Sequence, residues 1–318
     1  MIIIFSTEAD YDSQSVIGWL SFLNEDYVLI SSLNNELKGD ITFSIQNLQP
    51  LLRVNGKKID RENLKSVWFR RSSTVQLSQS IEEDCRQYLT REYQSYLDSI
   101  KYLLESNHSC LGSHSKGILN KLSVLNDAEL CGLSIPETIL SNCKKSVFEF
   151  IKSINGKVIV KAISDTITFE RQGKVYTSYA NEIGLDDLEE MELKEFPVLC
   201  QRKIEKEFEI RTFYLESEFY SMAIFSQMDE SASTDFRASQ SKKKVRKVPF
   251  QLSGQIENKL QKLMTKIGLN TGSIDLIRSS DGQTYFLEVN PAGQIGMTSK
   301  PCNYYLEKKI AHYLSENP

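Results

Sequence analysis

Two acids and an amide near the C-terminus are spaced in a way that suits a metal ion. Asp275 precedes the dipeptide Asp281-Gly282, and Glu288 and Asn290 follow it. This dipeptide is typical of two-residue β-turns. A hairpin with that turn pairs Asp275 with Glu288 and places Asn290 one pleat further along the same face. Opposed side chains on paired strands have Cβ atoms about 4.5–5.5 Å apart, and like charges held so close are destabilising. We therefore expect a positive charge between the two carboxylates.

The chemistry of these three side chains favours Mg²⁺. Two carboxylates and an amide oxygen are hard donors, and Mg²⁺ usually binds a few protein oxygens together with nucleotide phosphates. The alternative is a hairpin whose acids merely face solvent. Against it, Ile, Leu, Phe and Val are the sequence neighbours of both acids. The sequence therefore predicts a Mg²⁺ site at Asp275, Glu288 and Asn290.

Such a site calls for phosphate groups, but the sequence lacks the usual phosphate-binding loops. Gly112 and Gly117 have the spacing of a P-loop, yet Ile118-Leu119 stands where Lys-Ser/Thr is required. No G-x-G-x-x-G motif occurs. Phosphate is therefore expected to be held by side chains.

Lys161 is the first candidate for holding phosphate. It interrupts the apolar stretch 158–163, where a charge is costly without an anionic partner. Lys121 and Arg237 are further candidates, although a lysine on an amphipathic helix or an arginine in a loop is more often simply solvated.

The order and spacing of these residues resemble the ATP-grasp superfamily over residues 116 to 298. In that family ATP lies between two β lobes, adenine meets the backbone of a hinge strand, and an acidic pair with Asn holds Mg²⁺. The resemblance implies that Lys121 and Lys161 contact phosphate or adenine, that Glu209 contacts ribose and that Arg237 contacts phosphate. One departure is that 164–168 lacks the glycines that many members place over the triphosphate. The cofactor-binding residues implied are Lys121, Lys161, Gln201, Arg202, Lys203, Ile204, Glu209, Arg211 and Arg237, with Gln201 to Ile204 as the adenine hinge.

A second resemblance lies nearer the N-terminus. Val67-Trp-Phe-Arg-Arg71 looks like the Trp-aromatic-Arg-Arg strand of the microviridin-type ligases, or graspetide maturases, and the chain is similar to their grasp-with-SPASM branch. In that family the leader of a ribosomal precursor peptide binds the enzyme, and core Asp or Glu side chains are joined to Ser, Thr or Lys. From the residues alone, Arg70 and Arg71 could bind a carboxylate through the forked guanidinium, or could make structural ion pairs.

These features together predict an ATP-dependent carboxylate ligase that forms side-chain ester or amide rings in a precursor peptide through an acyl phosphate. The catalytic residues expected are Lys161 and Arg237, which offset developing charge, and Arg70 or Arg71, which orients the carboxylate. Two alternatives stay open: a ligase that adds free amino acids to a peptide or protein terminus, and a nucleotide sensor without turnover.

Composition limits the other classes of function. Of 318 residues, 40% are hydrophobic and 25% are charged, as in soluble globular proteins. The net charge of −4 disfavours nucleic acid as a partner, although the basic run 242–247 could recruit an acidic peptide or could simply be solvated. The short apolar start lacks a basic region before it, so we expect no signal peptide, no membrane association and a cytoplasmic location. A homodimer is left open.

The pattern of elements that must position these residues indicates an α/β protein with the ATP-grasp fold. We expect a pre-ATP-grasp α/β lobe at 1–115, a central lobe at 116–197 and a β-rich C-terminal lobe at 198–318. A long amphipathic helix should follow a capping box formed by Ser80 and Glu83. The other elements expected are strands at 1–6, 27–31, 41–45, 51–54, 67–70 and 158–163, a hairpin of 166–170 with 175–179, and helices at 15–23, 121–133, 145–154, 253–267 and 304–314.

Overall fold

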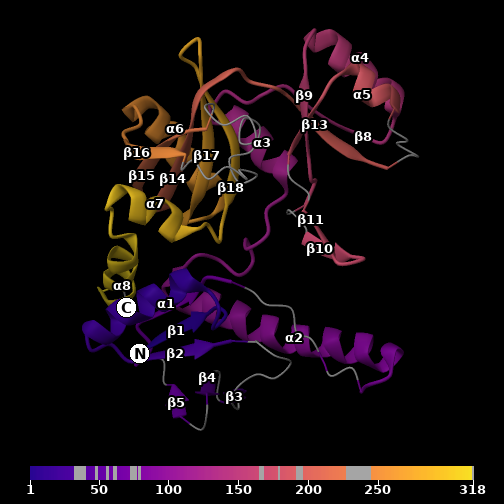
Figure 1. Ribbon diagram of the computed structural model, residues 1–318. Helices are drawn as coiled ribbons and strands as arrows, with labels where there is room; N and C mark the ends of the chain where they lie inside the picture. Colours follow the sequence, from indigo (N-terminus) through magenta and orange to yellow (C-terminus); the bar gives the residue numbers. More distant parts are fainter. Residues whose placement is uncertain are drawn as a thin grey trace.

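The computed structural model contains three main sheets, each covered by helices (Figure 1). It describes residues 1–31, 41–46, 49–54, 57–59, 63–71, 77, 80–164, 168–177, 180–190, 196–226 and 245–316. The mixture of helices and strands confirms the predicted α/β class.

The N-terminal lobe is built on a parallel sheet that is buried on both faces. Its strands, in spatial order, are β2 (Tyr27–Ile30), β1 (Ile2–Phe5), β6 (Ser66–Phe69) and β7 (Cys110–Leu111). Ile2 and Ile4 face α1 (Tyr11–Phe22) and the C-terminal helix α8 (Leu306–Glu316), whereas Ile3 and Phe5 face α2 (Glu83–Asn107). Burial on both faces explains why the first strand is uninterruptedly apolar.

A small antiparallel sheet adjoins this lobe. It consists of β3 (Ile41–Gln46), β4 (Gln49–Val54) and β5 (Lys57–Ile59). Val54 pairs with Lys57, and Asn55 and Gly56, between them, lie outside the described residues.

The central sheet is antiparallel and carries two helices. Its strands, in spatial order, are β12 (Asn181–Ile183), β9 (Val158–Lys161), β13 (Val198–Arg202) and β8 (Thr138–Ser141). Helices α4 (Lys144–Ile154) and α5 (Leu185–Glu190) pack on its apolar face. The hairpin of β10 (Thr168–Arg171) and β11 (Lys174–Thr177) pairs as predicted and projects toward α2 (Figure 1).

The C-terminal sheet contains the longest strands. In spatial order they are β16 (Arg246–Phe250), β15 (Glu218–Phe225), β14 (Lys206–Leu215), β17 (Thr271–Ser279) and β18 (Thr284–Asn290). Helices α3 (Lys121–Leu130) and α6 (Gly254–Ile267) bury their apolar sides against it. Helix α3 therefore packs on the C-terminal sheet, although its residues were expected in the central lobe. Strand β13 belongs to the central sheet, although its residues were expected in the C-terminal lobe. The domain boundaries at 116 and 198 remain a prediction.

Some helix starts differ from the predicted ones: α1 begins at Tyr11 rather than at residue 15. Helix α2 begins at Glu83, its N-cap is Glu82 rather than the predicted Ser80, and the Glu82 side chain makes no capping hydrogen bond. Residues 295–302 form helix α7 (Ile295–Cys302), which the sequence did not indicate because Gly296 and Pro301 disfavour a helix. Pro301 is tolerated near the helix end, and α8 begins only at Leu306.

Candidate active site

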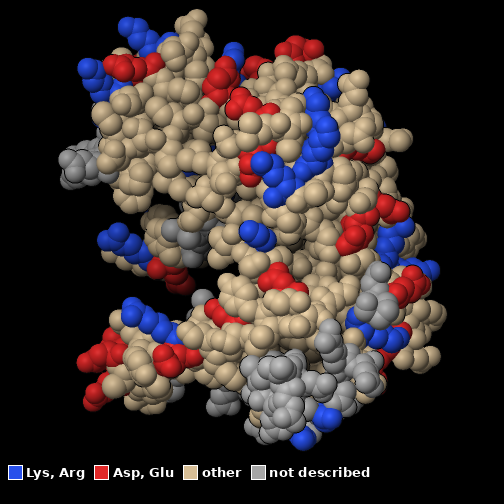
Figure 2. Space-filling view, turned by 180° about the vertical axis from the view of Figure 1, so that it is seen from behind, with Lys and Arg blue, Asp and Glu red and all other residues tan. Residues whose placement is uncertain are grey.

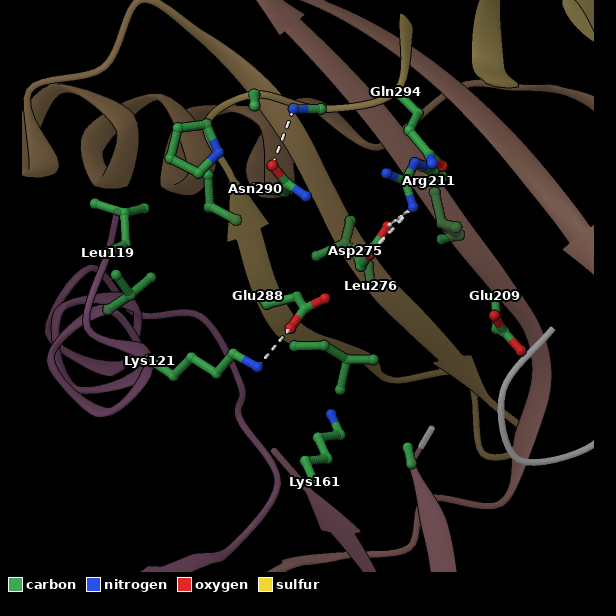
Figure 3. A pocket seen from close by; sticks show the side chains of 18 of the residues that line it. Leu119, Lys121, Lys161, Glu209, Arg211, Asp275, Leu276, Glu288, Asn290 and Gln294 are labelled. Atoms are coloured by element: carbon green, nitrogen blue, oxygen red, sulfur yellow. Dashed lines mark hydrogen bonds and ion pairs between the residues drawn. The ribbon is translucent and has the colours of Figure 1, made fainter. Parts of the chain in front are cut away.

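A cavity of about 430 Å³ lies where α3, the end of β9 and the C-terminal sheet face one another (Figure 3). The polar residues that line it come from the N-terminal lobe, the central sheet with the start of α3, and the C-terminal sheet with the loop that follows β18. They are Arg71, Lys121, Lys161, Lys206, Glu209, Arg211, Asp275, Glu288, Asn290 and Gln294.

The predicted opposition of the two acids is confirmed. Asp275 pairs with Glu288, and Ser273 pairs with Asn290. The predicted two-residue turn is wrong, however. Ser279 N–H donates to the Gln283 carbonyl at 2.9 Å, so three residues form the loop, with Gly282 left-handed at φ +85°.

A bulge in β18 restores the register that the longer loop shifts. Leu276 pairs with Phe286 while Asp275 pairs with Glu288, which leaves Leu287 as the extra residue. The loop shifts the pairing by one residue and the bulge shifts it back. The two acids therefore meet on one face of the hairpin.

Each acid has a cation beside it. Arg211 pairs with Asp275 in register on β14, and its Nη1 lies 3.3 Å from Asp275 Oδ1. Lys121 Nζ lies 4.0 Å from Glu288 Oε2 (Figure 3). Two side chains of the protein itself thus each lie beside one of the carboxylates.

The residues present fit a Mg²⁺–nucleotide. Asn290 Oδ1 accepts the Gly293 N–H at 3.0 Å, and an amide oxygen has a second lone pair for a metal. Arg211 is buried, and its Nε makes no hydrogen bond, so a ligand oxygen would satisfy a donor that is otherwise costly to bury. Within the described chain no three His, Cys, Asp or Glu side chains cluster as metal ligands.

The loop after Asn290 is held by close backbone approach. Gly293 has φ +27°, and a Cβ added there would lie 2.3 Å from Ser273 Oγ. Only glycine fits this position, and the loop thereby stays against β17 beside Asn290.

The structure brings both predicted lysines into this cavity. Lys161 is the last residue of β9, and Lys121 is the first residue of α3. Lys121 Nζ donates to the Ala162 carbonyl at 3.0 Å, which ties the start of α3 to the end of β9. Both lysines therefore reach the side of the cavity opposite Asp275 (Figure 3).

Glu209 lines the cavity together with a lysine that the sequence did not single out. Lys206 forms an ion pair with Glu209, and Ser226 Oγ donates to Glu209 Oε1 at 2.8 Å. The pairing of β14 with β17 shifts register between Lys206 and Phe208. Simple alternation along the strand therefore does not predict that Lys206 lines the cavity.

The predicted adenine hinge is not among the cavity-lining residues. Gln201 is buried, and its Nε2 donates to Thr138 Oγ1 at 3.0 Å. Arg202 pairs with Glu137 at 2.8 Å, and Lys203 pairs with Glu182 at 2.9 Å. Ile204, the fourth hinge residue, also does not line the cavity.

Glu182 anchors the turn around this segment. Hydrogen bonds from Lys157 and then Lys203 lower the pKa of Glu182 below its ordinary value. The same contact raises the pKa of Lys203. The charged side chains of the segment are thus bound to neighbouring acids, and the hinge role of Gln201 to Ile204 stays a prediction.

The adjacent arginines differ in environment. Arg70 is 2% exposed and lies 3.1 Å from Asp10 and 2.9 Å from Asp12, so it makes the structural ion pairs that were the alternative. Burial lowers its pKa, and Asp10 and Asp12 partly offset this. Arg71 is 43% exposed, also contacts Asp10 at 2.9 Å, and lines the cavity. Arg237 and residues 242–244 lie outside the described residues.

The face seen from behind carries charged side chains of both signs (Figure 2). These basic and acidic side chains are interspersed, and the surface is hollowed above and below the projecting β10–β11 hairpin. None of the described helices is long and apolar enough to cross a membrane.

Solved structures resemble the whole chain, whereas no protein-family model and no curated protein sequence matches it. A RiPP-associated ATP-grasp ligase of Chryseobacterium gregarium, in complex with ADP and a leader and core peptide, is 24% identical with a TM-score of 0.88, over 100% of this chain and 97% of that chain. Macrocyclase MdnC from Microcystis aeruginosa MRC, bound with precursor peptide MdnA, is 24% identical with a TM-score of 0.83, over 100% of both chains.

More distant structures extend the comparison. ATP-grasp ligase PsnB, complexed with a phosphomimetic variant of a minimal precursor, Mg and ADP, is 18% identical with a TM-score of 0.76, over 99% of this chain and 98% of that chain. The chain therefore has the ATP-grasp fold, and the predicted fold class is confirmed.

Proposed function

We propose that the chain is an ATP-dependent ligase that joins side chains of a ribosomal precursor peptide into ester or amide rings. The observation that carries this proposal is one cavity in which the opposed acids, four other cationic side chains and Arg71 meet. Proteins with this fold that were solved with ADP, Mg or precursor peptides support it.

In this proposal Asp275, Glu288 and Asn290 would hold Mg²⁺, and Arg211 and Lys121 would turn from these acids toward phosphate oxygens. ATP would supply the phosphoryl group that converts a peptide carboxylate into an acyl phosphate. A hydroxyl or amine of the same peptide would then attack the acyl carbon and displace inorganic phosphate. Lys161 and, outside the described residues, Arg237 offset the charge that develops during transfer.

Arg71 is the residue that we assign to the reacting carboxylate. Its guanidinium lines the cavity and is anchored through Nε to Asp10, which leaves its outer nitrogens for a bidentate contact. In this proposal Arg70 does not contact the peptide. It holds Asp10 and hence the orientation of its neighbour.

Glu209 and the hinge complete the proposed nucleotide site. Glu209 would accept from the ribose hydroxyls, for which its position in the cavity is suited. Residues 201–204 would contact adenine through their backbone, and they lead directly into Lys206, which lines the cavity.

The test is a reaction of the protein with ATP, Mg²⁺ and a precursor peptide encoded by a neighbouring reading frame. Ring formation removes one water per bond and releases ADP, so the peptide should lose mass in whole steps of water. Gain of an amino-acid mass would instead favour the amino-acid ligase. Nucleotide binding without peptide-dependent ADP release would favour the sensor. Glu288→Gln serves as the inactive control.

A further inference from the structure

One carboxylate of the N-terminal lobe caps the helix that follows the candidate metal site. Asp12, in the first turn of α1, accepts the Ile295 N–H through Oδ2 at 2.9 Å and the Gly296 N–H through Oδ1 at 3.0 Å. These are the first two residues of α7. Gln294, at the N-cap position itself, makes no side-chain capping bond. The cap therefore comes from a residue 283 positions away in the chain.

The same carboxylate is bonded to the buried arginine. Arg70 Nη2 donates to Asp12 Oδ2 at 2.9 Å, and Arg70 Nε donates to Asp10 Oδ2 at 3.1 Å. Asp10 in turn accepts Arg71 Nε at 2.9 Å. An unbroken chain of charged contacts thus leads from Arg71, in the cavity, to the start of α7. All of its members except Arg71 are largely buried.

The loop between the metal site and α7 is held at both ends. At one end Asn290 belongs to β18 and accepts the Gly293 N–H. At the other end the two N–H groups of α7 are held by Asp12. The residues between, 291–294, line the cavity. Gly296 approaches so closely that an added Cβ would lie 2.8 Å from Asp12 Oδ1.

We propose that Asp12 is a positioning residue for the metal site. It holds loop 291–294 and thereby Asn290 in place, and through Arg70 it orients Arg71 at the same time. This inference rests on the proposed function, since it assigns the loop a role in Mg²⁺–nucleotide binding. If the Asp12 contact only held two lobes together, its loss would destabilise the protein but would leave unchanged the gain in ADP affinity that Mg²⁺ provides.

The test is Asp12→Asn, which keeps the size of the side chain but leaves it only one acceptor oxygen. Two quantities are measured: amide hydrogen exchange of peptides covering 290–298 in the free protein, and calorimetric affinity for ADP with and without Mg²⁺. Exchange should become faster. The gain in ADP affinity that Mg²⁺ provides should fall about tenfold or more, the range typical of groups that orient metal ligands. Affinity for ADP without Mg²⁺ should stay about the same.

Two further variants separate positioning from general damage. Glu25→Gln removes another partly buried ion pair of the same lobe, 2.8 Å from Lys65, and should leave both quantities unchanged. Gly296→Ala disturbs the Asp12 contact from the side of α7 and should act like Asp12→Asn. It also keeps the proposal testable if Asp12→Asn does not fold.

Unchanged exchange at 290–298 would overturn the proposal, and so would an equal loss of ADP affinity with and without Mg²⁺. If the wild-type protein binds no ADP at all, the proposed function fails. Faster exchange in Asp12→Asn would then still support the conclusion that Asp12 holds the start of α7 and the loop before it, and unchanged exchange would refute that conclusion.

Discussion

Asp275 faces Glu288 across β17 and β18, and each of the two carboxylates has a cation of its own. Arg211 lies beside Asp275, and Lys121 lies beside Glu288. A metal–nucleotide that takes both acids would release both cations for phosphate.

Glu288→Gln should abolish metal-dependent nucleotide binding and ADP formation while the protein stays folded. In the wild type, Mg²⁺–ADP at one hundred times its Kd should stabilise the fold by about 2.7 kcal/mol, and the variant should lack this shift. Without ligand the variant should be as stable as the wild type or more so, because Asp275 loses a like-charged neighbour. Thermal unfolding with and without ligand measures this, with Glu137→Gln as an exposed control. Full activity of Glu288→Gln would refute the metal assignment.

Lys161→Met should weaken ATP binding about tenfold or more, equivalent to roughly 1.4 kcal/mol, because the stem stays in β9 while the charge is lost. Calorimetry measures the affinity. Lys157→Met is the control, since Lys157 lies directly before the same strand but pairs with Glu182 outside the cavity. Unchanged ATP binding by Lys161→Met would assign Lys161 a structural role.

Arg71→Lys should lower the saturating rate of ring formation more than the affinity for peptide. Lysine keeps the charge but loses the forked donor that orients a carboxylate. Neutralising residues 242–244 should have the opposite effect and weaken peptide binding in a salt-sensitive way, because exposed charges act over roughly 8 Å at physiological salt. Peptide titrations and rates at two salt concentrations distinguish them. Should Arg71→Lys reduce only affinity, the arginine would belong to recognition instead.

Gly293→Ala should destabilise the protein by about 1–3 kcal/mol, because the added Cβ would overlap Ser273 and the backbone has positive φ. Gly18→Ala is the matched control. Gly18 lies in α1 with nothing within 4 Å of an added Cβ, so alanine should stabilise by roughly 0.5–1 kcal/mol. Urea unfolding measures both, and equal stability of Gly293→Ala and the wild type would contradict the close approach.

His114 should make stability depend on pH in the mildly acidic range. Burial and then Lys101 lower its pKa below the ordinary 6.5, although Asp98 and Glu105 oppose this. The unfolded chain therefore binds a proton at higher pH than the folded chain does. The contribution of His114 is fully present above about pH 6.5 and is lost as the pH falls toward the folded pKa.

Unfolding free energies of the wild type and His114→Asn at about pH 7.5 and about pH 5.5 measure this contribution. The wild type should lose more stability than the variant between the two pH values. His312→Asn, in an exposed part of α8, should behave like the wild type. An identical pH dependence of His114→Asn and the wild type would contradict the prediction.

Local sequence was sufficient to predict that the residues of the candidate metal site lie close together. The facing of Asp275 and Glu288 follows from strand alternation around a turn at Asp281-Gly282, and the placement of Lys161 follows from a charge in an apolar strand. Each of these patterns depends on residues close in the chain. Even so, the pairing held only because a bulge compensated for a loop one residue longer than predicted.

Other features of the site were decided by tertiary packing. The residues next to Lys206 in sequence do not indicate that it lines the cavity, because its orientation depends on a register shift in β14. The two neighbouring arginines look equivalent in sequence, yet one is enclosed by Asp10 and Asp12 and the other reaches the cavity. The cap of α7 by Asp12 depends on contact between the two ends of the chain. Turns and alternation are set by neighbouring residues, whereas such contacts form only when distant segments pack together and share one buried charge network.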